Sequence, residues 1–500
     1  MDQLTNYKHK SDFLLSTDTS LNQHQPTQDT VKPKRKPKKC NECNKKRIIC
    51  DESNQICRNC YGTKLIYKPS GNKVIDDFIR YTLFNNTKFI GKMEFVPYDR
   101  FTDIKFIAEG GFSKIYKATW IDGPIRSWDK EKQSYSRRQN YQVVLKKLNN
   151  SKNITSKELN ELKIFYELSR YSFFTYIFIS KYFGITQDPI TQDIIIIIPY
   201  YNSGDLTNYI TNDFYSISWK TKFDKLKDII IGLSDIHKVN IIHRDFHSGN
   251  IFFHDYSKSS SIITIGDLGI SKSATESTDD NNENYGIIPY MAPEIFQGQK
   301  YTKASDIYSF GMIMWEFMTG RRPFWDRNHD TDLIIEICDG ERPPIVTNAP
   351  EGYIELMKEC WHSDPNKRPN ASVIRDKFRK MWNEAKQIPT EIIASADIGP
   401  VTTNNPSAIY KSRPLSGMIR SAMSTRSLRS QSITSDDLSY HYQKRNISFN
   451  VKEKRKLEDN KIENSFNEGK SIKKIKFGEN ENNNDYVTKE FGFDIDINSK

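Results

Sequence analysis

Apolar residues in the first half of this chain fall into short runs, which is typical of β-strands. The last run, Ile194–Ile198, holds five consecutive isoleucines and suits a strand that is covered on both faces. Between the strands, Leu159, Leu162, Phe165 and Leu168 recur at helical spacing and predict a helix from Ser156 to about Leu168. The strands are expected at Ile104–Ala108, Lys114–Thr119, Gln142–Leu148, Ile179–Thr186 and Ile194–Ile198, with a surface loop over Asp122–Asn140.

Beyond residue 200 the apolar spacing becomes mainly helical, apart from one short hairpin at Ile251–Phe253 and Ile262–Ile265. The pattern predicts an α+β chain with a small β-rich lobe, an extended crossing near Pro199–Gly204 and a larger helical lobe. The expected helices span Leu206–Ile210, Phe223–His237, Asp306–Thr319, Leu333–Cys338, Glu351–Trp361 and Ala371 to about Ala385.

The polar texture of both ends sets the expected boundaries. Residues 1–39 form a polar, basic arm that ends in KPKRKPKK, and residues 386–500 are rich in Ser, Thr, Asn, Lys and Glu. Such composition cannot bury enough apolar surface to offset the entropy of folding, so we expect both ends to be disordered. Residues 40–70 hold most of the cysteines, residues 71–100 predict a connector helix, and residues 101–385 form the main domain.

Charge and hydropathy narrow the class of protein. The 500 residues carry 74 Lys and Arg against 63 Asp and Glu, a net charge of +11 that permits contact with nucleic acid without requiring it. A membrane span needs about 20 apolar residues, and the longest aliphatic run has five. MDQLTNYKHK lacks the apolar centre of a signal peptide. We therefore expect a cytoplasmic protein, and the basic runs leave nuclear import open.

Five of the seven cysteines lie between Cys40 and Cys60. Cys40 and Cys43 form one CxxC pair, and Cys57 and Cys60 form a second. Four thiolates satisfy a tetrahedral Zn²⁺ at about 2.3 Å, and so small a segment would need the metal in order to fold. The spacing predicts a small zinc ribbon. Unrelated free thiols are the alternative.

The fifth cysteine, Cys50, allows a second arrangement. With Lys45, Lys46 and Arg47 in the first loop, the cluster resembles the fungal binuclear zinc cluster of transcription factors. That family needs a sixth cysteine, and the corresponding place near Tyr67 has none. The resemblance implies a module that binds nucleic acid, but it lacks one bridging ligand.

The octet HRDFHSGN, His243–Asn250, matches the catalytic-loop signature of protein kinases. In that chemistry an aspartate, here Asp245, accepts the proton of the attacking hydroxyl. An asparagine, here Asn250, reaches the metal that holds the nucleotide phosphates.

Other motifs follow the order of the same family. EGGFSK predicts a strand–turn–strand flap whose backbone amides cover phosphates, and VVLKKL places Lys146 in a strand. Glu161 lies on the next helix, Asp267-Leu268-Gly269 follows the catalytic loop, and PYMAPE ends at Glu294. Residues 101–385 thus resemble a protein kinase domain, and PYMAPE, DIYSFGMIMWE and CWHSDPNKRP resemble the tyrosine-kinase-like group.

The resemblance implies a role for each matching residue. Lys146 contacts the α- and β-phosphates of ATP and pairs with Glu161, and Asn250 and Asp267 hold Mg²⁺. Arg244 pairs with a phosphate at Ser273, Thr275, Ser277 or Thr278 on the mobile loop at residues 271–285, the site of an upstream kinase. Asp306 anchors the catalytic loop, and Glu294 pairs with Arg368. The nucleotide-binding residues are Ile107, Gly110, Gly111, Lys146, Ile198 as gatekeeper, Tyr200, Asn250 and Asp267.

Several positions depart from the family pattern. Of the three flap glycines only Gly110 is present, because Ala108 and Ser113 occupy the other places. His247 stands where serine/threonine kinases carry lysine, and Ile287 stands where they carry threonine. Tyrosine kinases carry arginine where this chain has Gly249. Neither acceptor signature is complete.

The sequence therefore predicts an intracellular ATP- and Mg²⁺-dependent protein kinase that modifies Ser and Thr, with Tyr left open, in protein substrates. The first rival is a different class, a pseudokinase scaffold that binds nucleotide without efficient transfer. The degraded flap supports this rival, and the retention of Lys146, Asp245, Asn250 and Asp267 argues against it. A second rival is a zinc module that binds nucleic acid and carries the kinase domain as an accessory. Its missing sixth cysteine counts against it.

Overall fold

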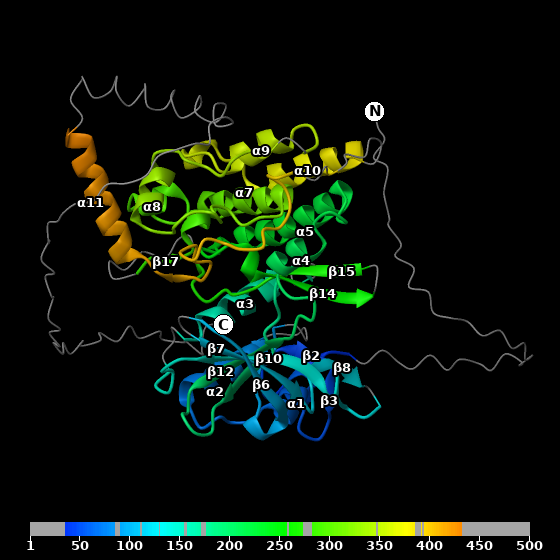
Figure 1. Cartoon of the computed structure of the whole chain (residues 1–500). Helices are drawn as coiled ribbons and strands as arrows, with labels where there is room; N and C mark the ends of the chain where they lie inside the picture. Colours follow the sequence, from blue (N-terminus) through cyan, green and yellow to red (C-terminus); the bar gives the residue numbers. More distant parts are fainter. Residues whose placement is uncertain are drawn as a thin grey trace, which may run out of the picture. The chain divides into compact units, whose positions relative to one another are not determined.

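The computed structural model describes residues 36–85, 91–110, 113–129, 131–154, 158–171, 177–257, 260–273, 283–346, 349–385, 392 and 395–432. Across these residues the chain forms a β-rich N-terminal lobe and a helical C-terminal lobe, as the sequence predicts (Figure 1). Within the described part of the chain, no helix combines the length and apolar character that a membrane crossing requires.

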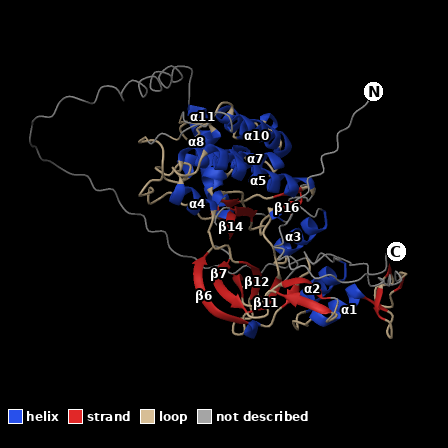
Figure 2. Ribbon diagram, turned by 90° about the vertical axis from the view of Figure 1, so that its right-hand side faces the viewer, coloured by secondary structure: helices blue, strands red, loops and turns tan. Residues whose placement is uncertain are grey.

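The N-terminal lobe is built on a six-stranded sheet of order β5-β11-β12-β10-β7-β6 (Figure 2). All neighbours in it are antiparallel except β5 and β11. Its strands are β5 (Glu94–Phe95), β6 (Phe101–Glu109), β7 (Ser113–Trp120), β10 (Tyr141–Leu148), β11 (Gly184–Gln187) and β12 (Ile194–Pro199).

The isoleucine run forms β12, which is buried on both faces. Ile194 and Ile196 belong to the main hydrophobic core, whereas Ile195 and Ile197 belong to a second core on the other side of the sheet. Because side chains alternate along a strand, five apolar residues in a row are what two covered faces require. Helix α3 (Asn160–Tyr171) contributes Leu162 and Phe165 to the main core.

The C-terminal lobe gathers its helices around α7 (Lys303–Thr319), in which every residue from Ser305 to Thr319 is buried. The predicted hairpin is present as β14 (Ile251–Ser257) and β15 (Ser260–Ile265), which pair antiparallel. The other helices are α4 (Leu206–Asp213), α5 (Trp219–Lys238), α6 (Pro293–Phe296), α8 (Thr331–Cys338), α9 (Tyr353–Cys360) and α10 (Ala371–Ala385).

The cysteine-rich segment is small and docks on the N-terminal lobe. It contains β1 (Lys38–Lys39), β2 (Lys46–Arg47), β3 (Ile49–Asp51), β4 (Ile56–Cys57), α1 (Arg58–Ile66) and, after it, α2 (Lys73–Asn85). Gly62 of α1 faces Trp128 and Tyr135 so closely that a Cβ there would lie 2.7 Å from the Tyr135 hydroxyl. Only glycine fits at this approach.

The prediction of a surface loop between β7 and β10 is wrong in part. Its central residues form a hairpin of β8 (Ile125–Asp129) and β9 (Ser134–Arg137). Trp128 and Tyr135 pack edge to face, with ring centroids 4.9 Å apart, and meet α1. The polar composition of this stretch concealed the hairpin, because two aromatic residues and a tertiary contact hold it.

The prediction of disorder from residue 386 onward is also wrong for residues 395–432. This segment forms β18 (Arg413–Pro414) and α11 (Ser416–Ser432), which lies near α8 (Figure 1). Leu415, Ile419 and Ala422 are buried in the main core. Their spacing places them on one face of a helix, so three apolar residues dock a segment that is otherwise polar.

Candidate active site

Lys146 reaches the centre of the site because β10 alternates its side chains between two faces. Its Nζ lies 3.0 Å from Glu161 Oε2 on α3 and 2.8 Å from Asp267 Oδ1 after β15. The neighbouring Lys147 points to the other side, where its Nζ lies 2.8 Å from Asp188 Oδ2. The strand register thus decides which of two adjacent lysines enters the site.

The charges of this cluster stabilise one another in a largely buried place. Burial opposes the charge on Lys146, but Asp267 and Glu161 outweigh it and hold the lysine pKa above its ordinary value. Burial likewise opposes ionisation of Asp267, and Lys146 nevertheless lowers the pKa of that carboxyl. Burial raises the pKa of Glu161. The Asp267 side chain keeps 42% of its surface exposed, which leaves the carboxylate accessible to a ligand.

Tyr182 completes the cluster, although no sequence motif predicts its role. Its hydroxyl donates to Glu161 Oε1 over 2.7 Å, and its ring packs against Phe165 of α3. The tyrosine therefore fixes the rotamer of the glutamate that faces Lys146. A lone aromatic residue between α3 and β11 carries no motif, so only the fold assigns it this place.

The catalytic loop is held from below by Asp306 of α7. Its carboxylate accepts hydrogen bonds from the backbone amides of His243 and Arg244, at 2.9 and 3.0 Å, and lies 2.8 Å from His237 Nε2. These bonds support Arg244 at a backbone φ of 73°, a left-handed conformation that a non-glycine residue adopts rarely. The Asn250 side-chain amide donates to the Asp245 carbonyl over 2.9 Å and closes the loop.

His247 occupies a defined position beside Asp245. The Gly249 amide donates to His247 Nδ1 over 3.1 Å, so this nitrogen carries a lone pair and the proton of the neutral ring sits on Nε2. Nε2 lies 3.6 Å from Asp245 Oδ1. The histidine that replaces the lysine of serine/threonine kinases is thus directed at the proposed base.

The flap and the adenine side hold the remaining predicted residues. The Gly110 amide donates to the Ser113 carbonyl over 2.7 Å and closes the flap turn. Ile107 is exposed on β6, and Ile198 of β12 lies half-buried opposite Val144. The Tyr200 amide donates to the Gln142 carbonyl over 3.2 Å. Gly111 lies outside the described residues.

Two further expectations concern the loop that ends at PYMAPE. Arg368 forms two 2.7 Å bonds with the Glu294 carboxylate in the interior of the C-terminal lobe. Arg244 lies over the Tyr301 ring, 4.4 Å from its centroid. Ser273 belongs to β16 (Lys272–Ser273), which pairs with β13 (Ile241–Ile242). Thr275, Ser277 and Thr278 lie outside the described residues.

The four cysteines of the two CxxC pairs converge at one point. The Sγ atoms of Cys40, Cys43, Cys57 and Cys60 all lie within 4.8 Å of one another. A tetrahedral Zn²⁺ with bonds of about 2.3 Å needs sulfur atoms about 3.8 Å apart, and Cys43 and Cys57 Sγ are 3.9 Å apart. Cys50 is not part of this group, and its thiol donates to the Ile56 carbonyl.

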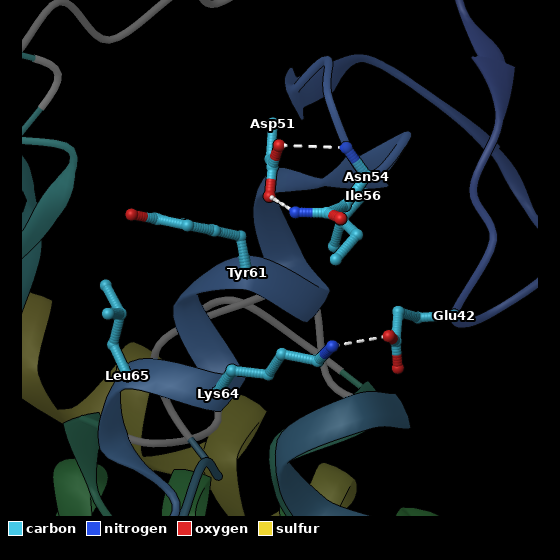
Figure 3. A pocket seen from close by; sticks show the side chains of 7 residues that line it. All are labelled: Glu42, Asp51, Asn54, Ile56, Tyr61, Lys64 and Leu65. Carbon is cyan, nitrogen blue, oxygen red and sulfur yellow. Dashed lines mark hydrogen bonds and ion pairs between the residues drawn. The ribbon is translucent and has the colours of Figure 1, made fainter.

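The surroundings act differently on the thiols of the cluster, because burial raises the pKa of Cys43 and Cys60 whereas hydrogen bonds lower the pKa of Cys40. Burial alone would raise the pKa of Cys40, but backbone amides, chiefly that of Cys57, lower it to about 6. The Arg47 guanidinium approaches Cys57 Sγ at 4.0 Å. Beside the cluster, a pocket of about 400 Å³ is bordered by Asp51 bonded to Asn54 and by Lys64 paired with Glu42 (Figure 3). These charged groups already have partners.

A β-rich lobe that carries a Lys–Glu–Asp cluster, joined to a helical lobe with an anchored HRD loop, defines the protein kinase fold. Residues 101–378 match the family of protein tyrosine and serine/threonine kinases. The match covers more than half of the chain, and the chain therefore belongs to this family.

Individual relatives agree with the family. The chain is 32% identical over 180 residues to the serine/threonine/tyrosine-protein kinase HT1 of Arabidopsis thaliana, covering 36% of this chain and 45% of that protein. It is 29% identical over 299 residues to a Dictyostelium discoideum protein named as a serine/threonine-protein kinase, pats1, covering 57% of this chain and 9% of the relative. A mimivirus protein named as a serine/threonine-protein kinase/receptor is 30% identical over 184 residues, covering 36% of this chain and 11% of the relative. The chain therefore spans less than half of each relative.

Proposed function

We propose that this chain is an ATP- and Mg²⁺-dependent protein kinase that transfers the γ-phosphate to serine and threonine hydroxyls of proteins. The observation that carries the proposal is the bridge from Lys146 to Glu161 and Asp267, at 3.0 and 2.8 Å. A fixed cation between two lobes can bind phosphate oxygens, because Glu161 and Tyr182 hold it in place before ATP arrives.

Each residue then has a chemical task. Asp245 accepts the proton of the substrate hydroxyl, and His247 directs an N–H toward its carboxylate. Asp267 and Asn250 supply the oxygen ligands that suit Mg²⁺, which neutralises charge on the transferred phosphate when it is bound. Gly110 and the flap backbone cover the phosphates, and Ile198 and Tyr200 line the adenine side. Arg244 receives a phosphate on residues 271–285.

The type of hydroxyl that accepts the phosphate and the kinase subgroup are both inferred from resemblance to known kinases. The names of the relatives support a serine/threonine acceptor, and that of the Arabidopsis protein includes tyrosine as well. PYMAPE and CWHSDPNKRP support the tyrosine-kinase-like group. His247 and Ile287 match neither acceptor signature, so tyrosine remains a second acceptor in this proposal.

A structural zinc ion at Cys40, Cys43, Cys57 and Cys60 completes the proposed function. The convergence of four sulfur atoms supports it, and the separate position of Cys50 favours one metal over two. The ion would hold the two CxxC turns of the segment together. It would thereby keep α1 in the position in which Gly62 faces the N-terminal lobe.

Purified full-length protein with ATP and Mg²⁺ tests the kinase activity. We expect autophosphorylation and transfer to casein, and phosphosite mapping identifies the acceptor residue. Asp245→Asn should lower kcat by about 10²- to 10⁴-fold, because it removes a general base without changing the fold. Equal labelling by the wild type and the variant contradicts the proposal, and nucleotide binding without transfer in the wild type identifies a pseudokinase.

A further inference from the structure

The folded part of the tail, residues 395–429, crosses the C-terminal lobe as a continuous strap, which we call the C-terminal latch. It begins where the Gly399 amide donates to the Thr319 carbonyl over 2.7 Å. The Tyr215 hydroxyl donates to the Ile398 carbonyl, also over 2.7 Å. A Cβ at Gly399 would lie 1.9 Å from that hydroxyl, so the latch starts at a position built for glycine.

The middle of the latch follows the loop that comes after α7. The Asn405 amide donates to the Trp325 carbonyl, and the His329 amide donates to the Ser407 carbonyl, at 2.9 and 3.0 Å. The Arg413 guanidinium donates to the His329 carbonyl over 2.7 Å. Backbone bonds of this kind hold an extended segment in register with little dependence on its side chains.

The latch then adds a strand to the segment that precedes PYMAPE. β18 pairs antiparallel with β17 (Tyr285–Gly286), with Gly286 opposite Arg413. The Leu415 amide donates to the Asn284 carbonyl, and the Asn284 amide donates to Ser416 Oγ, both over 2.8 Å. The edge of residues 284–286 is therefore occupied by this chain's own tail.

The segment that follows this edge in the chain contacts the catalytic loop through Tyr290. Tyr290, four residues after Gly286, places its hydroxyl 3.2 Å from Ser248 Oγ and donates to Glu316 over 2.6 Å. Tyr410 of the latch packs under Arg322, with the guanidinium 4.6 Å from the ring centroid, and the charge of Arg322 acts on Glu316 and Asp205. Through Tyr410 the latch thus contacts Arg322, whose charge acts on Glu316, the hydrogen-bond partner of Tyr290.

We propose that the edge at residues 284–286 and the loop at residues 321–329 form the surface that receives an extended peptide of a protein substrate, and that residues 405–416 occupy it in the resting chain. The inference rests on the proposed kinase function. A substrate can then bind only when the latch is open. Its apparent Kd is the intrinsic Kd divided by the fraction of molecules whose latch is open.

The anchor of the latch is apolar. Leu415, Ile419 and Ala422 are buried, whereas the ion pairs of α11, Arg426 with Asp339 and Arg429 with Asp332, are exposed at the surface. Exposed pairs of this kind contribute little. Loss of one buried leucine should therefore open the latch, and loss of a surface pair should not.

The test uses full-length protein with Leu415→Asp, which places a charge in the buried anchor. Leu428→Asp is the matched control, because Leu428 lies in the same latch, on α11, at 65% exposure. A fluorescent peptide of residues 403–418 is added and its anisotropy is measured, and the KM for casein is measured separately. We expect Leu415→Asp to bind the peptide about tenfold more tightly than wild type or control, and to show about a tenfold lower KM for casein with an unchanged KM for ATP.

Equal peptide affinity in all three proteins, or an unchanged KM for casein in an active enzyme, overturns the proposal. If no protein transfers phosphate, the kinase function fails, and peptide binding alone still decides whether the latch covers this surface. If Leu415→Asp does not fold, Tyr410→Ala replaces it. That variant removes the ring under Arg322 and the hydroxyl bond to the Pro323 carbonyl, and we expect about a fivefold change in the same direction.

Discussion

The active site and the cysteine cluster are two polar centres of very different origin. The cysteines lie within residues 40–60 and meet because short turns bring them together. Lys146 and Asp267 are separated by 121 positions, and a large hydrophobic core brings them to 2.8 Å. One centre is made by local sequence and the other by the whole domain.

This difference predicts what each centre depends on. The cysteine segment has a core cluster of five residues, three of which are cysteines. So small a cluster cannot outweigh chain entropy without a ligand. The active site sits between lobes that fold without it. Changes at the cysteines should therefore alter folding of their segment, and changes at Lys146 should alter the reaction.

The largest effect is expected at the cysteines. Cys57→Ser removes one of four ligands, and the free energy at stake is that of a structural zinc, about 10–16 kcal/mol in zinc-finger peptides. Metal analysis of the wild type should give about one zinc per chain, and the variant should give almost none. Hydrogen exchange in α1 should rise, while the C-terminal lobe stays protected.

Cys50→Ser provides the matched control, because Cys50 lies in the same segment outside the group of four. It should retain the zinc of the wild type. Loss of metal from this variant contradicts a single four-cysteine site, and absence of zinc from the wild type removes the metal altogether.

The second effect is on catalysis. Lys146→Met removes the cation that faces the phosphates, and we expect kcat/KM to fall by about 10²- to 10³-fold, as for loss of one preorganised electrostatic group. Lys147→Met is the control, because the adjacent lysine points to Asp188 and Asp193. Similar losses in both variants, measured by steady-state kinetics, argue against the assignment of Lys146.

The smallest effect is a dependence of stability on pH. Burial raises the pKa of Glu316 from 4.5 to about 7. Between these values the folded chain binds a proton that the unfolded chain releases, so the free energy of unfolding decreases as pH rises. The free energy of unfolding decreases by about 1.4 kcal/mol for each pH unit, which gives a total decrease of about 3 kcal/mol between the two pKa values. Urea denaturation of Glu316→Gln at pH values across this window should show a smaller decrease, and an identical pH slope contradicts it.

Much of the kinase core follows from the sequence because its chemistry demands fixed residue types at fixed spacing. Asp245 and Asn250 must share one loop, and Lys146 must lie in a strand. The isoleucine run predicts a strand with two covered faces. Local spacing is enough for these predictions, since the periodicity or loop length on which they depend is contained in a few residues.

The family resemblance selected Lys146, and the strand register supplies the physical reason, because it turns Lys146 toward Glu161 and Lys147 toward Asp188. Tyr182 needed the fold, since its partner Glu161 lies 21 positions away. The hairpin at Trp128 and Tyr135 and the latch at residues 395–429 have polar sequences, and each is held by a few apolar residues whose burial depends on a distant surface.

The sequence by itself determined the family, the order of the catalytic parts and the four-cysteine spacing. The tertiary structure decided how Lys146, Glu161 and the catalytic loop are oriented, and that the tail covers the edge at residues 284–286. The physical reason is the range of the interactions. The residues of a motif are close together in the sequence, so the sequence alone reveals them. The orientation of side chains and the covering of a surface depend on contacts between distant segments, which form only with the core.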